Sequence, residues 1–143
     1  PNSEALEKII DSQTDNELWL AALMYDSEKT DCEPVYFANI HISKISWIDR
    51  RCTFGRLIGN ANMRGKGIGS NLTREIIKYC FCTLGMQKVT AGCLENNIAA
   101  IKSNLKAGMI EEAILRKDRF VNGKFVDTHI FAAWANSWPH ENN

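Results

Sequence analysis

The segment Arg64-Gly-Lys-Gly-Ile-Gly69 is the part of the chain whose residue types most clearly suggest chemistry. Closely spaced glycines let consecutive main-chain N–H groups converge on one point, and a helix that begins there adds the positive end of its dipole. Arg64 and Lys66 add positive charge. A turn of this kind can hold a phosphate or pyrophosphate group.

The spacing excludes two common phosphate-binding loops. A Walker A loop requires G-x-x-x-x-G-K-[ST], which the sequence lacks. A dinucleotide loop requires G-x-G-x-x-G, but Ser70 or Leu72 stands at the third glycine in the two possible registers. The pattern present is R-x-x-G-x-G, and its alternative interpretation is a tight turn that binds nothing.

Charge is unevenly distributed along the chain. The formal net charge is zero, yet residues 44–78 hold eight bases and two acids, and residues 1–33 hold nine acids and two bases. A basic window in a neutral protein favours a local anionic ligand over a long nucleic-acid track. The alternative is a solvated basic face.

The pattern of the whole chain predicts one α/β domain with a mixed sheet over residues 1–143. Apolar periodicity and turn residues delimit the elements. Asn122-Gly123 is a strong hairpin signal between the last two strands. The predicted helices cover residues 3–10, 70–84 and 97–107, and the predicted strands cover residues 17–25, 34–42, 51–58, 87–94, 112–121 and 124–134.

Three motifs in this order resemble the Gcn5-related N-acetyltransferase (GNAT) superfamily. The first is the glycine-rich turn, which is similar to that family's acetyl-CoA pyrophosphate loop. The second is Asn97-x-x-Ala-Ile, followed by Lys106-x-Gly-Met. The third is the spacing from Gly108 to Asp127, which resembles the ribosomal-protein alanine acetyltransferase (RimJ/RimL) subgroup.

The resemblance implies the GNAT acyl-CoA N-acyltransferase fold, acetyl-CoA as cosubstrate and no metal. A family member normally opens with a strand and a helix ahead of the segment that residues 3–10 match, so we expect a chain that lacks both. The strands at 51–58 and 87–94 would splay apart around the acetyl-pantetheine arm. The coenzyme-binding residues implied are Leu57, Ile58, Arg64, Gly65, Lys66, Gly67, Ile68, Gly69, Ser70, Asn97 and Asn104.

The catalytic residues of relatives carry over incompletely. Many relatives have a Tyr seven residues after the motif Asn, where this chain has Asn104. An amide can hydrogen-bond a leaving thiolate but cannot protonate it. RimL-type relatives often have a Glu at the position of Thr53. Glu95 is therefore the first candidate for the general base, and the further candidates are His41, Asp49 and His129.

The implied function is transfer of an acetyl group from acetyl-CoA to a primary amine, which could belong to a small molecule, an amino sugar or a protein N-terminus. The alternative is a non-catalytic acyl-CoA-binding or assembly module. Five cysteines without C-x-x-C spacing, no visible signal peptide and no long apolar run favour a cytoplasmic protein. We expect neither nucleic-acid nor membrane partners, and the resemblance is compatible with a homodimer.

Overall fold

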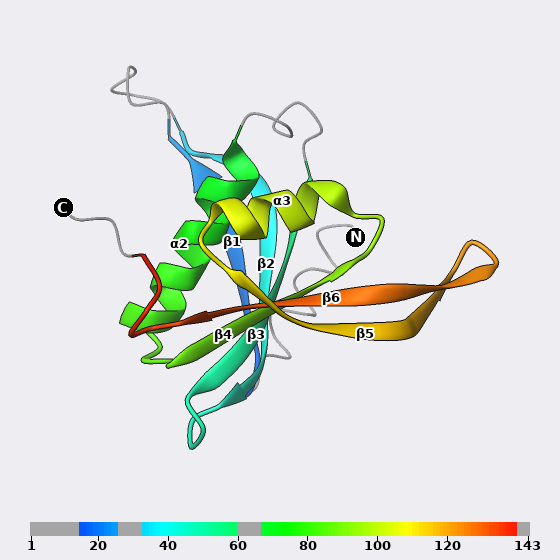
Figure 1. Ribbon diagram of the computed structural model, residues 1–143. Coiled ribbons are helices and arrows are strands. Elements are labelled where there is room, and N and C mark those ends of the chain that lie inside the picture. Colours follow the sequence, from blue (N-terminus) through cyan, green and yellow to red (C-terminus); the bar gives the residue numbers. More distant parts are fainter. Residues whose placement is uncertain (1–14, 26–32, 60–66, 140–143) are drawn as a thin grey trace.

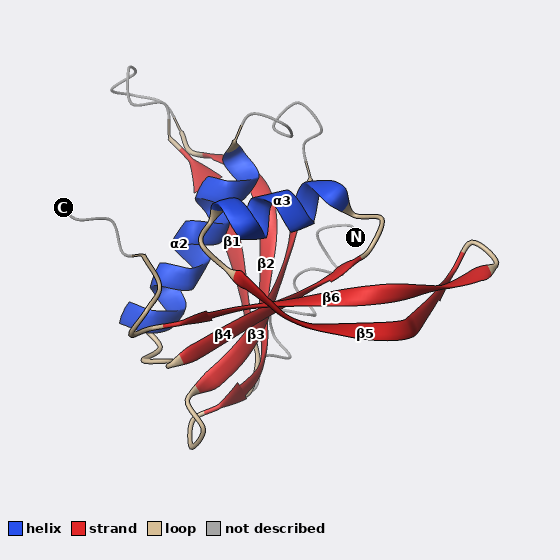
Figure 2. Cartoon of the chain, in the orientation of Figure 1, coloured by secondary structure: helices blue, strands red, loops and turns tan. Residues whose placement is uncertain are grey.

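The computed structural model describes residues 15–25, 33–59 and 67–139. Figures 1 and 2 show a single twisted sheet with two helices side by side on one face. The predicted helix at 3–10 and most of the predicted loop at 26–33 lie outside the described residues. In chain order the elements are β1 (Leu18–Met24), β2 (Val35–Ser46), β3 (Arg51–Ile58), α2 (Ile68–Cys82), β4 (Lys88–Leu94), α3 (Ile98–Lys106), β5 (Ile110–Val121) and β6 (Lys124–Trp134).

The six strands form one mixed sheet in the order β1-β2-β3-β4-β6-β5. Only β3 and β4 run parallel, because helix α2 carries the chain across the sheet between them. All other neighbours are antiparallel. The predicted mixed α/β fold is therefore confirmed. Neither helix in the described part of the chain is long and apolar enough to cross a membrane.

Side chains alternate between the two faces of the sheet along each strand. The helix face, which α2 and α3 cover, carries the buried side chains Ile42, Phe54 and Phe131. Residues between these positions point to the other side, called here the opposite face. Gly55 of β3 and Gly92 of β4 lie there, and both are exposed. Helix α2 contributes its own buried stripe to the core, formed by Leu72, Ile76, Ile77, Cys80 and Phe81.

Two of the predicted boundaries that differ from the structure have a local reason. Strand β2 continues past the predicted end at Ile42 to Ser46, because a bulge with Lys44 at φ 51° lets the pairing resume at Ser46 and Arg51. Helix α2 begins at Ile68 rather than Ser70, because Gly67 adopts the left-handed conformation and caps the helix start. The helix start therefore lies inside the glycine-rich turn.

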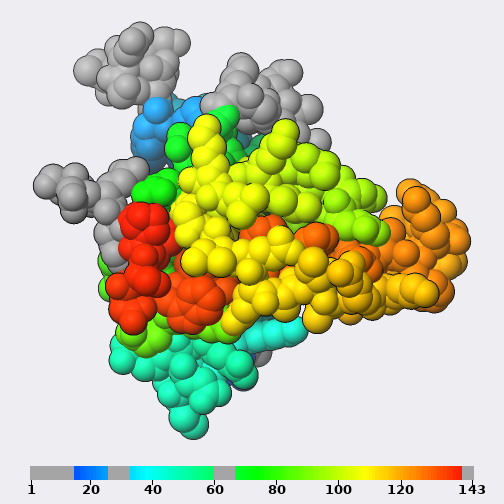
Figure 3. All heavy atoms as spheres, viewed as in Figure 1, coloured from blue at the N-terminus to red at the C-terminus, as the bar shows by residue number. Residues whose placement is uncertain are grey.

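The β5–β6 hairpin extends beyond the rest of the described chain (Figures 1 and 3). Strand β5 is the sheet's edge, and nearly all its residues are exposed. Its register against β6 shifts twice, between Glu111 and Ala113 and between Leu115 and Arg119. Lys117, in the second irregular stretch, has φ 49°. The edge strand is therefore bent rather than straight.

Candidate active site

The parallel ladder between β3 and β4 stops early. Paired positions are Arg51 with Lys88, Cys52 with Val89, and Thr53 with Thr90. Beyond them, β3 continues to Ile58 and β4 to Leu94 without further pairing to each other. We call this divergence, formed by residues 54–58 and 91–94, the fork. The hydroxyl groups of Thr53 and Thr90 are hydrogen-bonded to each other at its apex.

Main-chain groups of β3 alternate between β2 and the fork. The Gly59 N–H donates to the Phe37 carbonyl at 2.9 Å, which fixes the hydrogen-bonded positions of the antiparallel β2–β3 ladder. By that alternation, the main chain of Leu57 pairs with β2, whereas the main chains of Arg56 and Ile58 face the fork. The geometry thus separates the two predicted arm-binding residues. The side chain of Leu57 lies on the opposite face, 58% exposed.

Helix α2 begins beside the fork. Ser70 Oγ donates to the Gly67 carbonyl at 2.9 Å, and Thr73 Oγ1 donates to the Gly69 carbonyl at 2.7 Å. The first turn contains no acidic residue, so nothing on the helix opposes an anion at its positive end. Gly67, Ile68, Gly69 and Ser70 therefore have the predicted place at a helix start. Arg64, Gly65 and Lys66 lie outside the described residues.

Helix α3 packs beside α2 at a close approach. A Cβ atom on Gly69 would meet Ser103 Oγ at 2.9 Å, so glycine permits this contact. Asn97 caps α3, and its Oδ1 accepts the Ala100 N–H at 3.3 Å. Asn97 is thus the N-cap of α3. Its role toward a coenzyme stays a prediction.

Asn104 is fully buried on α3 and reaches the β4 side of the fork. Its Nδ2 donates to Cys93 Sγ at 3.1 Å. Its Oδ1 is buried and has no hydrogen-bond partner among the described residues. Because a buried polar atom without a partner lowers the free energy of unfolding by roughly 1–3 kcal/mol, a purely structural role for Asn104 would reduce stability. Asn104 Oδ1 is therefore a buried acceptor beside the fork that a bound group could satisfy.

Arg56 and Cys93 lie on the two sides of the fork and act on each other electrostatically. Burial lowers the pKa of the Arg56 guanidinium, and Cys93 opposes that shift. Burial raises the pKa of the Cys93 thiol, while Arg56 and the hydrogen bond from Asn104 oppose it. A sulfur atom at this position therefore has a nearby cation and an amide donor. Sequence reasoning did not single out Arg56, because nothing local marks its position beside the fork.

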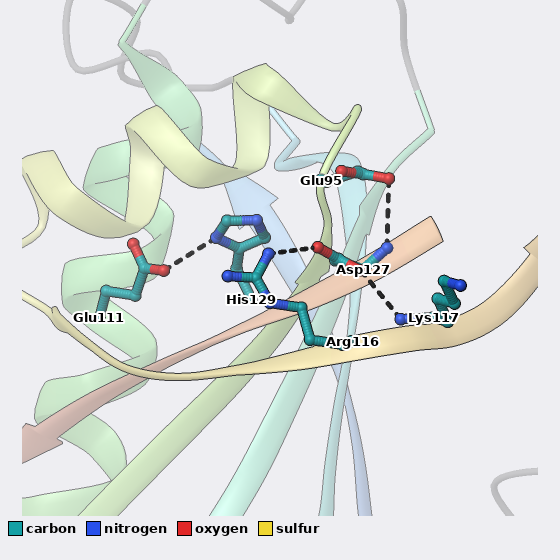
Figure 4. A network of polar contacts seen from close by, with 6 residues as sticks. All are labelled: Glu95, Glu111, Arg116, Lys117, Asp127 and His129. Atoms are coloured by element: carbon teal, nitrogen blue, oxygen red, sulfur yellow. Dashed lines mark hydrogen bonds and ion pairs between the residues drawn. The ribbon is translucent and has the colours of Figure 1, made fainter. Parts of the chain in front are cut away.

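Glu95 follows β4 at the end of the fork (Figure 4). Its main-chain N–H donates to the Asp127 carbonyl at 3.0 Å, and its Oε1 accepts the Asp127 N–H at 3.2 Å. The carboxylate thus holds the main chain of β6. Glu95 remains the predicted base from the sequence, but this contact orients it toward Asp127.

Asp127 holds the bend in β5. Its Oδ2 accepts from Arg116 Nη1 at 2.8 Å, and its Oδ1 accepts the Lys117 N–H at 2.9 Å. The Lys117 N–H and the Arg116 guanidinium lower the pKa of the Asp127 carboxyl. His129 is separate, since its Nδ1 pairs with Glu111 Oε1 at 2.9 Å on the other strand of the hairpin (Figure 4). The ion pair between Asp127 and Arg116 therefore has a structural role.

A second histidine–carboxylate pair lies on the opposite face. His41 Nε2 and Glu17 Oε1 are 2.6 Å apart, and the imidazole stacks on Trp19 with ring centroids 4.1 Å apart and planes at 11°. His41 is paired across β2–β3 with Gly55, beside the fork. His41 was among the predicted candidates for the base, but no local pattern marks Glu17, which is 24 residues away.

The candidate base Asp49 and the exposed Trp47 of the same turn lie away from the fork. Asp49 is in the turn before β3, at the strand end remote from the fork, and is 3.9 Å from Arg51. Trp47 is half exposed and donates from Nε1 to the Asp15 carbonyl at 2.8 Å. Within the described ranges, no group of three or more His, Cys, Asp or Glu side chains could hold a metal ion.

The structure also contains an apolar groove of about 600 Å³ between β1, β2 and α2. It lies toward the β1 edge of the sheet rather than in the fork. Ile68 and Asn71 bring its rim to the start of α2. The groove is thus a neighbour of the candidate site and shares only the first turn of α2 with it.

Comparison with known protein families identifies the class of domain to which this fold belongs. Residues 2–110 match the family model described as "Acetyltransferase (GNAT) domain" (Acetyltransf_3). The chain therefore belongs to the GNAT acetyltransferase domain family. The specific resemblance to the RimJ/RimL subgroup remains a prediction.

Named relatives are similar over part of the chain. The probable N-acetyltransferase YjcK of Bacillus subtilis is 32% identical over 68 residues, which are 48% of this chain and 38% of that protein. The spermidine N(1)-acetyltransferase of Vibrio cholerae is 26% identical over 88 residues, 62% of this chain and 50% of that protein. The matched region thus spans half or less of these two relatives.

A solved structure shows the same fold. The spermidine N-acetyltransferase from Vibrio cholerae, in complex with CoA and spermine, superposes with a TM-score of 0.79 at 20% identity. The match covers 95% of this chain and 77% of that one. At this identity the likeness establishes the fold alone and leaves the substrate open.

Proposed function

We propose that this chain is an acetyl-CoA-dependent N-acetyltransferase that acts on a primary amine, and that residues 1–143 form one GNAT domain. The observation that carries the proposal is the fork, where the β3–β4 ladder stops at Thr53 and Thr90 although both strands continue. An extended ligand with amide groups can take the place of a strand there. Bound acetyl-CoA would supply such an arm and a reactive thioester.

The residues around the fork fit the coenzyme. The main chains of Arg56 and Ile58 face the arm's position and can supply hydrogen bonds along it. The first turn of α2, together with Arg64 and Lys66, suits a pyrophosphate. Asn97 and Asn104 on α3 border the same space, and the orphaned Asn104 Oδ1 is an acceptor that a bound group could satisfy.

Asn104 and Arg56 suit the leaving group. A thiolate released near Cys93 would have the guanidinium of Arg56 as a neighbouring cation and the Asn104 amide within reach. Charge stabilisation of this kind lowers the need for a proton donor, since a thiolate is a tolerable leaving group near neutral pH. This arrangement supports catalysis in a chain that lacks the Tyr of relatives.

The acceptor in this proposal is a small-molecule amine. The related spermidine N(1)-acetyltransferase and the acidic residues of the first 33 positions support a cationic acceptor. The proposal extends to a cytoplasmic location, which suits the reduced state of Cys52, Cys80, Cys82 and Cys93.

The direct test has two parts, binding and turnover. Acetyl-CoA binding is measured by calorimetry, and turnover by release of free thiol with spermidine, glucosamine and an alanyl peptide as acceptors. We expect binding and turnover on at least one amine. Binding with no turnover on any amine would favour the non-catalytic acyl-CoA-binding module, and no binding would reject both functions.

An isosteric charge change tests the pyrophosphate position. Asn71→Asp adds a carboxylate to the first turn of α2, where it opposes an anion. At about 1 kcal/mol, the affinity for acetyl-CoA should fall roughly fivefold. Asn122→Asp makes the same change at the tip of the β5–β6 hairpin and should leave affinity unchanged. Equal affinities of the two variants would place the pyrophosphate elsewhere.

A further inference from the structure

The opposite face of the sheet gives access to the fork. Helices α2 and α3 cover the helix face, whereas Gly55, Leu57 and Gly92 are exposed on the opposite face. A Cβ atom on Gly55 would meet no atom within 4 Å. On the other strand of the fork, a Cβ atom on Gly92 would meet Ile130 Cδ1 at 3.4 Å, so the open space lies on the Gly55 side. We take this side as the path of an incoming amine.

His41 stands at the edge of this opening. It is paired with Gly55 at a hydrogen-bonded position of the antiparallel ladder, where Cα atoms are roughly 5.5 Å apart. The next strand of a sheet lies about 4.8 Å further on. A group held in the fork therefore lies roughly 10 Å from the His41 Cα, a distance that the imidazole and a short chain of water molecules can span.

Glu17 and Trp19 fix the imidazole. A carboxylate 2.6 Å from Nε2 favours the tautomer with the proton on Nε2, which leaves Nδ1 as the proton acceptor. Stacking on Trp19 fixes the ring plane. Among the described residues, Glu17 and Trp19 face His41 from β1. The residues on the same face of β3 are Thr53, Gly55 and Leu57, which carry no charge. Glu17 is therefore the one charged neighbour of His41 in this part of the chain.

We propose that His41 is the general base of the acetyl transfer and that Glu17 is its positioning residue; this inference rests on the proposed function. The ammonium form of the acceptor gives one proton to His41 Nδ1. The nitrogen of the acceptor amine then forms a bond to the acetyl carbon, while the carbon–sulfur bond breaks and leaves its electron pair on sulfur. The second nitrogen-bound proton neutralises the thiolate, and His41 returns its proton to solvent.

This assignment differs from the one that the sequence favours. The Glu95 carboxylate accepts the Asp127 N–H, whereas the Glu17 contact leaves Nδ1 of His41 as the proton acceptor, on a strand position paired with Gly55 of the fork. His129 offers a matched comparison, because it is also paired with a glutamate, at 2.9 Å. It stands on β6 opposite Cys93, on the other side of β4 from the fork.

The experiment measures free-thiol release with the best acceptor among spermidine, glucosamine and an alanyl peptide. His41→Gln should lower kcat by about 100-fold or more, with the KM for acetyl-CoA changed by less than about twofold, because uniform binding is untouched. The dependence of log(kcat/KM) on pH should lose, in His41→Gln, one limb that the wild type shows. Glu17→Gln should lower kcat roughly 10-fold, and His129→Gln should match the wild type.

Chemical rescue separates a base from a packing residue. Imidazole added to His41→Ala should restore part of the rate, and it should not accelerate Glu95→Gln. If the wild type turns over and His41→Gln stays within threefold of it, or if Glu95→Gln alone removes the pH limb, the His41 assignment is wrong and the proposed function stands. If the wild type binds acetyl-CoA and acetylates none of the three amines, both the proposed function and the His41 assignment are wrong.

Discussion

Replacement of Asn104 by Leu should leave the ligand-free protein as stable as the wild type or make it more stable, while removing activity. Leu has the same branched shape and has no polar atom to satisfy. The substitution removes the orphaned Oδ1, which costs roughly 1–3 kcal/mol, and loses a hydrogen bond to sulfur worth less than about 1 kcal/mol. The free energy of unfolding should therefore rise by zero to about 2 kcal/mol.

The measurement is urea unfolding without coenzyme, followed by tryptophan fluorescence. The upper limit corresponds to roughly 4–8 °C in Tm for a chain of this length. Thr73→Val is the matched control, because Thr73 is equally buried but its hydroxyl is satisfied by the Gly69 carbonyl at 2.7 Å. That variant should lose about 0.5–1.5 kcal/mol.

Activity completes the comparison. If Asn104 serves the thioester sulfur or the arm, Asn104→Leu should lower kcat/KM by at least about 10-fold, equivalent to 1.4 kcal/mol. The reasoning is refuted if Asn104→Leu destabilises the free protein as much as Thr73→Val does. In that case Asn104 is retained for packing, and its unpartnered oxygen says nothing about a ligand.

Three further outcomes follow from the structure. In thermal unfolding, Gly108→Ala should lower the free energy of unfolding by about 2–4 kcal/mol and Gly123→Ala by about 1–2 kcal/mol. Both glycines have positive φ, but only a Cβ at position 108 would meet the Pro139 ring, at 2.9 Å. Equal losses in the two variants would contradict the crowding at Gly108. Asp127→Asn should flatten the acid side of the stability–pH curve. The lowered pKa of Asp127 makes its contribution present above the unfolded-chain pKa and lost as pH falls through the folded pKa, so an unchanged acid limb would be inconsistent with the Lys117 contact. Gly55→Ala should keep the unfolding midpoint and raise the KM for the amine, because the new methyl group enters open space on the acceptor side; an unchanged KM would put the acceptor on another path.

Elements set by local signals could be predicted from the sequence. The bounds of β3 and β6 are those expected, because alternation and turn residues mark both ends of each. The start and end of α3 follow from Asn97 as a cap and Gly108 at φ 90°. The fork was expected only through the family resemblance. No local pattern states where a parallel ladder ends.

Contacts between distant residues could not be predicted. The Glu17–His41 pair spans 24 residues and the Thr53–Thr90 contact spans 37, and each depends on the register of strands. A single bulge at Lys44 decides where β2 resumes its pairing with β3. The burial of Asn104 depends on how α3 lies against β4. An Asn in a short helix gives no such signal by itself.

The bend in β5 has a consequence for the behaviour of the protein in solution. A straight edge strand with exposed Ile110, Ile114 and Phe120 would offer a row of N–H and C=O groups for another chain to join. The two register shifts, and Lys117 held out of line by Asp127, interrupt that row. The Asp127 network therefore opposes edge-to-edge association with other chains, in addition to holding the bend in β5.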